Sequence, residues 1–179
     1  MNGVKDSELA PRLLITTFIG RERRVGEDVM NALFFKLKRI EVVPLVRRGI
    51  VIVFSEPDCD PWHMLNALRS LHIAGAFWAI PVERYAVARY EYIARECMEL
   101  VLTKPQHLPV TFIALCRKRG NYIDSCSRLC RFVGQRIESL GVAEVDFRSY
   151  EYVLRIEIVD DRAYISMYRR SDEPMLRIS

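Results

Sequence analysis

The chain has 179 residues, of which 50% are hydrophobic and 28% are charged, and its net charge is +4. This composition excludes intrinsic disorder and provides enough apolar residues for one large domain or two small ones. No apolar run reaches the roughly 18 residues that a membrane-spanning helix needs, and the polar start of the chain does not resemble a targeting signal. We therefore expect a cytoplasmic protein without a membrane segment.

Arginine supplies 22 of the 27 cationic side chains. The guanidinium group binds phosphate through two parallel hydrogen bonds and stacks on bases, whereas lysine acts mainly as a point charge. An arginine-rich chain with few amides is also typical of thermophiles, so nucleic-acid binding and heat adaptation both explain this composition. The arginines form local clusters rather than one basic half, so a binding face has to be assembled by the fold.

The first 87 residues alternate between strand and helix patterns. In the predicted helix over 22–37, apolar side chains recur every four residues, and Asp60 with Pro61 is a typical start of a second helix, which we place up to residue 71. Branched and aromatic runs predict strands around these helices, over 12–18, 40–46, 50–54 and 77–82. The order βαββαβ is that of a ferredoxin-like domain.

A second set of elements follows, and we place the domain boundary near residue 87, giving domains 1–87 and 88–179. The apolar spacing predicts a connecting helix over 85–103 and a further helix over 123–139, which Gly141 ends. Strands are predicted over 111–116, 143–147, 152–159 and 163–168, with Asp160-Asp161 as the turn of the last hairpin. The fold class is therefore α+β, of the α/β sandwich type.

The segment Arg117-Lys118-Arg119-Gly120 is the most informative in the chain. It follows a buried-looking strand and precedes an amphipathic helix, so it delivers cations to the positive end of a helix. Gly120 removes a side chain where a ligand would come close. This combination favours a phosphate-bearing ligand.

Residues 112–166 resemble the THUMP domain, an RNA-binding module of tRNA-modifying enzymes, and the first 87 residues resemble the ferredoxin-like domain that precedes it. The resemblance rests on the order and spacing of seven short elements: Phe112 to Cys116, Arg117 to Gly120, Ser125, Gly134, Val145 to Phe147, Arg155 to Ile158, and Asp161 to Ser166. It implies that the protein captures the acceptor stem and the single-stranded 3′ end of tRNA.

The resemblance also implies which residues contact RNA. Arg117, Lys118, Arg119 and Gly120 match the family's RNA-contacting segment, and Asn121 and Tyr122 after them have the chemistry to bond or stack a base. A basic flank on the following helix and cations at the start of the first helix extend this set: Arg128, Arg131, Arg21, Arg23 and Arg24. For these outer residues, an ordinary solvated surface is the alternative interpretation.

The sequence shows neither a glycine-rich loop for a dinucleotide or methyl donor nor a phosphate-cradling loop before a helix. In architecture it most resembles stand-alone THUMP proteins that act as tRNA adaptors for an N4-cytidine acetyltransferase. We therefore predict a non-catalytic accessory protein, without a cofactor, that presents tRNA to a separate acetyltransferase. A small tRNA-modifying enzyme with an unrecognised site and a protein-interaction subunit that binds RNA incidentally are the alternatives.

The five cysteines do not form the paired pattern of a structural zinc site. Cys116, Cys126 and Cys130 have the spacing to meet, but Cys97, Cys126 and Cys130 also fall on apolar helix faces, where cysteine is commonly a small core residue. We predict no metal, and a disulfide only if the source is a hyperthermophile. The acidic residues Glu56, Asp58 and Asp60 are interpreted as a helix-capping loop.

Overall fold

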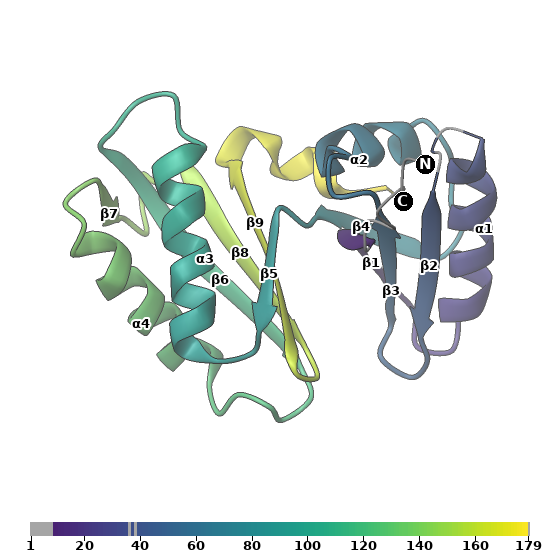
Figure 1. The fold of residues 1–179 in the computed structure, drawn as a ribbon, viewed down its shortest axis with the longest axis horizontal. Coiled ribbons are helices and arrows are strands. Elements are labelled where there is room, and N and C mark those ends of the chain that lie inside the picture. The colour runs from purple at the N-terminus through teal and green to yellow at the C-terminus, as the bar shows by residue number, and fades with distance from the viewer. Residues whose placement is uncertain (1–8, 36, 38, 179) are drawn as a thin grey trace, which may run out of the picture. The chain divides into compact units, whose positions relative to one another are not determined.

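The computed structural model describes residues 9–35, 37 and 39–178, and the chain forms two compact units. The first unit extends to Val82 and includes the segment from Met175 onward, and the second is Glu83–Pro174. Each unit has its own sheet with helices on it (Figure 1). Both units are thus α+β sandwiches, as the sequence predicted. No helix in the described part of the chain combines the length and the apolar character needed to cross a membrane.

The first unit has the strand order β2-β3-β1-β4, and all three strand pairs are antiparallel. This is the ferredoxin-like arrangement that the βαββαβ pattern predicted. Its elements are β1 (Ala10–Thr17), α1 (Glu22–Phe34), β2 (Ile40–Leu45), β3 (Ile50–Ser55), α2 (Pro61–Arg69) and β4 (Ala76–Pro81).

Local sequence explains both helices of this unit. The apolar repeat of α1 buries Val25, Val29 and Leu33 completely, whereas the helix ends at Phe34 rather than at residue 37. In α2, the Asp60 carboxylate accepts a hydrogen bond from the backbone N–H of Trp62 at 3.0 Å, so the predicted cap is confirmed. The apolar sides of both helices therefore belong to the buried core.

The second unit has the strand order β5-β9-β8-β6-β7. Strand β6 lies parallel to both β7 and β8, whereas β9 is antiparallel to β8 and to β5. The elements are β5 (Arg84–Val87), α3 (Tyr90–Thr103), β6 (Val110–Arg119), α4 (Cys126–Glu138), β7 (Ala143–Val145), β8 (Tyr152–Val159), β9 (Arg162–Arg169) and a 3₁₀ helix (Arg170–Leu176).

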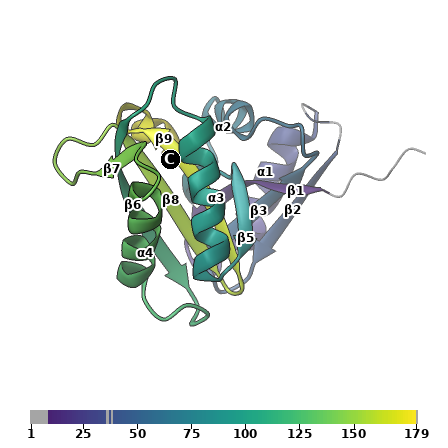
Figure 2. The same cartoon turned by 60° about the vertical axis from the view of Figure 1, so that its left-hand side comes forward.

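Helices α3 and α4 lie side by side over one face of this sheet (Figures 1 and 2). They enclose a core to which the alternate residues Val110 and Phe112 of β6 and Leu154, Ile156 and Ile158 of β8 contribute. Because side chains alternate along a strand, the intervening residues of β6 and β8 face the other way.

The predicted helix over 85–103 is wrong at its start. Residues Arg84–Val87 form strand β5, which pairs with β9, and α3 begins only at Tyr90. The pairing partner is nearly 80 residues away in sequence, so local apolar spacing does not reveal it. At the other end of the chain, the Ile178 N–H donates to the Phe77 carbonyl at 3.1 Å, so the last residues belong to the first unit rather than to the second.

Candidate nucleic-acid interface

The basic segment forms the end of strand β6. Arg117, Lys118 and Arg119 lie opposite residues 157, 158 and 159 of β8 in the parallel ladder, and the strand continues three residues past its predicted end at 116. Because the side chains alternate, Lys118 is on the face that carries the helices, and Arg117 and Arg119 are on the opposite face. The three cations are therefore divided between the two faces of the sheet.

Gly120 is where the chain leaves the sheet. Its φ of +113° is one that residues with side chains rarely adopt, and a Cβ there would lie 3.3 Å from a carboxylate oxygen of Asp160. The glycine is thus required by the backbone path beside the β8–β9 turn, independently of any ligand.

Arg119 is held by a buried carboxylate. Its Nη1 lies 2.8 Å from Oε2 of Glu157, which is fully buried, and Nε of Arg155 lies 2.9 Å from the other oxygen. Burial acts to lower the pKa of Arg155, but the charge of Glu157, the neighbouring Tyr168 and the hydrogen bonds to both together outweigh it. The pKa is therefore raised, and the guanidinium stays charged. Arg119 thus neutralises a buried charge in its own unit.

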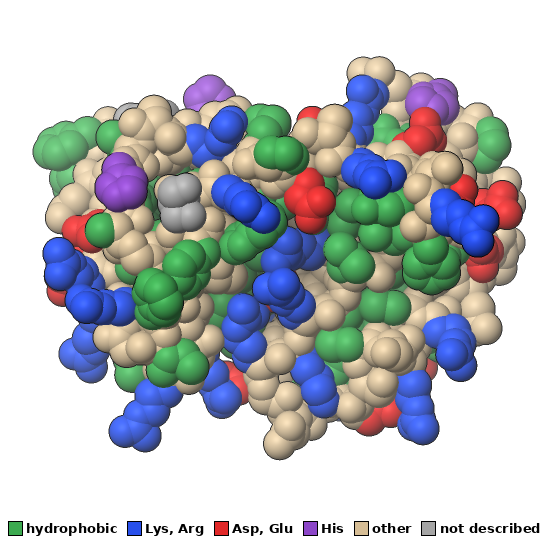
Figure 3. All heavy atoms as spheres, turned by 180° about the vertical axis from the view of Figure 1, so that it is seen from behind, with side chains coloured by type: hydrophobic (Ala, Val, Ile, Leu, Met, Phe, Trp, Pro, Cys, Tyr) green, Lys and Arg blue, Asp and Glu red, His purple; other side chains and the backbone are tan. Residues whose placement is uncertain are grey.

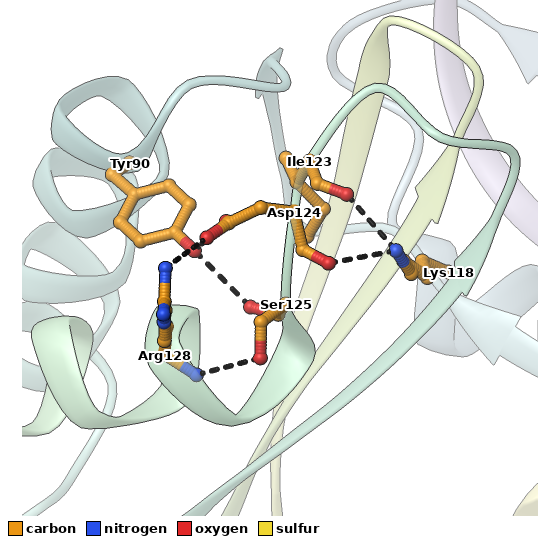
Figure 4. A network of polar contacts seen from close by, with 6 residues as sticks. All are labelled: Tyr90, Lys118, Ile123, Asp124, Ser125 and Arg128. Atoms are coloured by element: carbon orange, nitrogen blue, oxygen red, sulfur yellow. Dashed lines mark hydrogen bonds and ion pairs between the residues drawn. The ribbon is translucent and has the colours of Figure 1, made fainter.

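Lys118 ties the end of β6 to the start of α4. Its ammonium donates to the carbonyl of Ile123 at 3.0 Å and to that of Asp124 at 2.9 Å (Figure 4). The lysine therefore fixes the loop over 120–125 and keeps at most one donor for a ligand.

A second set of contacts fixes the helix end itself. The Tyr90 hydroxyl donates to the Asp124 carboxylate, and Arg128 Nη1 pairs with the other Asp124 oxygen at 3.0 Å (Figure 4). Ser125 caps α4 by accepting from the Arg128 N–H at 3.3 Å. Burial and the bond to Asp124 raise the pKa of Tyr90 to about 12, and the same bond lowers the pKa of Asp124. The tyrosine thus remains a donor and the aspartate an acceptor at neutral pH.

Four of the predicted site residues are exposed at this corner, beside the exposed side chains of Asp124 and Ser127. These four, which we call the α4 patch, are Asn121, Tyr122, Arg128 and Arg131. Tyr122 is 56% exposed, and Arg131 makes no hydrogen bond or ion pair within the described part of the chain. Arg117 is also exposed, but it lies on the other face of the sheet. The structure thus groups four of the predicted site residues, with Lys118 bonded to the loop beside them, and separates Arg117 and Arg119 from them.

The first unit carries a second basic corner. Arg21 is the N-cap residue of α1 without a capping side-chain bond, and Arg23 and Arg24 are exposed in its first turn. Between them Glu22 is buried, and its two oxygens accept from the N–H groups of Gly20 and Gly49, each at 2.9 Å. Burial acts to raise the pKa of Glu22, but these backbone N–H groups hold it below its usual value.

Because Gly49 is on the β2–β3 hairpin, Glu22 brings Arg47 and Arg48 to this corner as well. The site residues predicted from the sequence did not include these two, although Arg47-Arg48-Gly49 between two predicted strands is a typical hairpin sequence. Figure 3 shows a face of the molecule on which Lys and Arg side chains predominate over Asp and Glu, with hydrophobic side chains among them. Within the described residues, no group of three or more His, Cys, Asp or Glu side chains is arranged to hold a metal ion.

Comparison with known proteins gives similarity at the level of structure. No family model matches the chain, and no curated protein sequence does. Among solved structures, PH1313 from Pyrococcus horikoshii Ot3 is similar, with a TM-score of 0.72 and 19% identity over 89% of this chain and 55% of its own. A 4-thiouridine synthetase in complex with RNA and bound ATP has a TM-score of 0.62 and 16% identity, over 90% of this chain and 42% of its own.

TrmN from Thermus thermophilus is also similar, with a TM-score of 0.58 and 17% identity over 89% of this chain and 46% of its own. The chain thus spans about half the length of the solved structures that it matches. At these identities the similarity shows the fold, and it supports the THUMP-type fold that the sequence resemblance predicted.

Proposed function

We propose that this protein binds tRNA at its acceptor stem and 3′ end and presents it to a separate modification enzyme, with a tRNA cytidine N4-acetyltransferase as the candidate partner. The observation that carries this proposal is the α4 patch. Its loop and helix end are fixed by hydrogen bonds that Lys118 and Tyr90 donate and by the capping bond that Ser125 accepts, so the backbone that carries its outward side chains is in place before a ligand arrives.

The chemistry of the α4 patch suits single-stranded nucleic acid. Arg128 and Arg131 supply two cations for phosphates, and the N-terminal end of α4 adds a partial positive charge. The half-exposed ring of Tyr122 offers a flat surface on which an unpaired base stacks, a contact worth about 1–3 kcal/mol per base. Asn121 adds a donor and an acceptor for a base edge or a ribose hydroxyl.

The fold comparison supports the same choice of ligand. One of the similar solved structures is a 4-thiouridine synthetase bound to RNA. A fold similar to 90% of this chain therefore occurs in a protein seen with RNA, and we extend RNA binding to this chain on that basis.

Competition between RNA fragments tests the proposed ligand. A minihelix of acceptor and T arms is expected to compete with full tRNA, because the proposed contacts involve the acceptor end alone. Removing its single-stranded 3′ tail should abolish most of the competition, and Tyr122→Ala should make the protein insensitive to that removal. Equal competition by intact and trimmed minihelices would contradict the proposed grip on the 3′ end.

The adaptor role is tested with the partner enzyme. A protein that only positions tRNA increases the rate of acetyl transfer because it holds the tRNA next to the enzyme, so the two no longer have to meet by diffusion. The affinity of the enzyme for acetyl-CoA should stay unchanged. We expect stimulation by the wild-type protein and little by Arg128→Ala/Arg131→Ala. Turnover of tRNA by the isolated protein, supplied with acetyl-CoA, S-adenosylmethionine or ATP, would instead identify it as an enzyme.

A further inference from the structure

Three of the five cysteines lie together where β6 meets α4. The Sγ atoms of Cys116 and Cys126 are 2.6 Å apart, and Cys116 is also hydrogen-bonded to Cys130. All three side chains are partly exposed, so small oxidants reach them, whereas Cys97 is completely buried.

The fold explains this cluster. Cys116 is on the helix-bearing face of β6, where its side chain packs against the core, and Cys126 and Cys130 are one helical turn apart on α4. Since α4 packs on β6, both helix cysteines face the strand. Within the described residues, these cysteines are not arranged to hold a metal ion. We therefore consider the redox chemistry of their thiols.

Cys116 and Cys130 differ in acidity. The thiol of Cys116 donates a hydrogen bond to Cys130, which raises the pKa of Cys116 and lowers that of Cys130. Burial raises the pKa of both Cys97 and Cys59. Since the thiolate is the reactive form of cysteine, the lowered pKa favours an early reaction at Cys130, which lies one helical turn from Cys126 on α4.

We propose that this cluster is an oxidation site at which a peroxide converts Cys116 and Cys126 into an intramolecular disulfide, with Cys130 as the sulfur that reacts first. The Cys116 and Cys126 sulfurs are already close to the roughly 2.05 Å of an S–S bond, so the bond forms without moving either element far. This inference does not depend on RNA binding.

The chemistry proceeds in three steps. The Cys130 thiolate attacks a peroxide oxygen, the O–O bond breaks, and the departing hydroxide takes a proton and leaves as water. The Cys116 sulfur then attacks the resulting sulfenic sulfur, and the S–O bond breaks as a second water leaves with the Cys116 proton. Finally the Cys126 sulfur attacks Cys116, and Cys130 leaves and takes the proton that Cys126 loses. In total, two thiols give two electrons and two protons to one peroxide.

The disulfide would join β6 to the first turn of α4 across residues ten positions apart. Cross-linking restricts the unfolded chain, so the oxidised protein should melt higher than the reduced protein, by roughly 5 °C or more. The α4 patch should be unaffected, because its side chains point outward and the cysteines point toward the sheet.

Peptide mapping tests the proposal directly. Trypsin separates the three sulfurs: Cys126 is in residues 120–128, Cys130 is in residues 129–131, and Cys116 is in residues 96–117, because the Lys104–Pro105 bond resists cleavage. The last of these peptides also contains Cys97, so fragment-ion spectra of the linked peptides are used to locate the bond. After mild treatment with hydrogen peroxide and blocking of free thiols, we expect the peptides of Cys116 and Cys126 to be linked in the monomer. Cys59 and Cys97 should be blocked as thiols.

Variants separate the roles of the sulfurs. Cys130→Ser should give the same linked peptides but at least about tenfold more slowly, because the thiolate is missing. Cys126→Ser should accumulate a link between Cys116 and Cys130, and the matched control Cys59→Ser should behave like the wild type. Five free thiols after oxidation, links only between molecules, or a stable Cys116–Cys130 link in the wild type would overturn the proposal. An unchanged rate in Cys130→Ser would overturn the role of Cys130.

Discussion

At the level of single residues, the carboxylate of Glu157 is a charge whose burial is energetically costly unless it is paired. It is completely buried, and its charge is balanced by Arg155 and Arg119 from two neighbouring strands. The charges at 155 and 157 are two residues apart and so share a strand face, a signal readable from the sequence. The register that brings in Arg119 depends on the parallel pairing of β6 with β8, which the sequence does not reveal.

Glu157→Gln should destabilise the protein strongly. The amide keeps the size of the side chain but removes the charge, so the guanidinium of Arg155, which is only 6% exposed, loses its counter-charge. Breaking a buried ion pair in this way costs about 3–5 kcal/mol, measurable from the midpoint of urea unfolding. The exposed control Glu144→Gln should change the free energy of unfolding by less than about 0.5 kcal/mol. Equal losses in the two variants would refute this account.

Glu22 should make stability depend on acid pH. Its folded-state pKa is lowered from 4.5, so its contribution is fully present above that value and is lost as the pH falls through the lower folded pKa. Glu22→Gln should remove about 1–3 kcal/mol at pH 7 and less at low pH. The measurement is the free energy of unfolding of both proteins at several pH values below 7, and a constant difference between them would exclude this explanation.

At the level of elements, the sequence predicted most helices and strands because each carries a local signal. The cap at Asp60 and the apolar repeats of α1 placed the helices, and branched runs placed β3 and β8. The two features that the sequence did not predict depend on strand partners that are distant in sequence. Strand β5 forms because it pairs with β9, and β6 extends through residues 117–119 because these residues pair with β8. That continuation is why Arg117 is separated from the α4 patch.

Ser125→Ala tests how α4 is fixed. The hydroxyl accepts from the Arg128 N–H, and losing such a cap costs typically about 1 kcal/mol. We expect this loss in thermal unfolding together with a modest loss of tRNA affinity, since the helix end that carries Arg128 frays. Ser127→Ala, at an exposed position in the same turn, is the matched control and should leave both quantities nearly unchanged. A larger effect at 127 than at 125 would be inconsistent with the capping role.

At the level of the whole molecule, two basic surfaces are built by different means. In the second unit, Lys118 at the end of β6 binds the loop that carries the α4 patch. In the first unit, the buried Glu22 binds both the loop before α1 and the β2–β3 hairpin, and so brings the arginines of these two segments close together. Composition alone gave two explanations for the arginines. The structure adds that some of them, such as Arg119 and Arg155, neutralise a buried charge, so only part of the set is available to a ligand.

The salt dependence of tRNA binding should identify the available arginines. Each phosphate contact that is lost flattens the plot of log affinity against log salt concentration by about 0.7–0.9, so Arg128→Ala/Arg131→Ala should flatten it by roughly 1.4–1.8. The exposed pair Arg69→Ala/Arg95→Ala changes the net charge equally and should leave the slope nearly unchanged. Arg119→Ala is unsuitable for this purpose, because it takes one of two counter-charges from buried Glu157 and so confuses stability with binding. Equal flattening in the two double variants would mean that net charge, and not the α4 patch, holds the RNA.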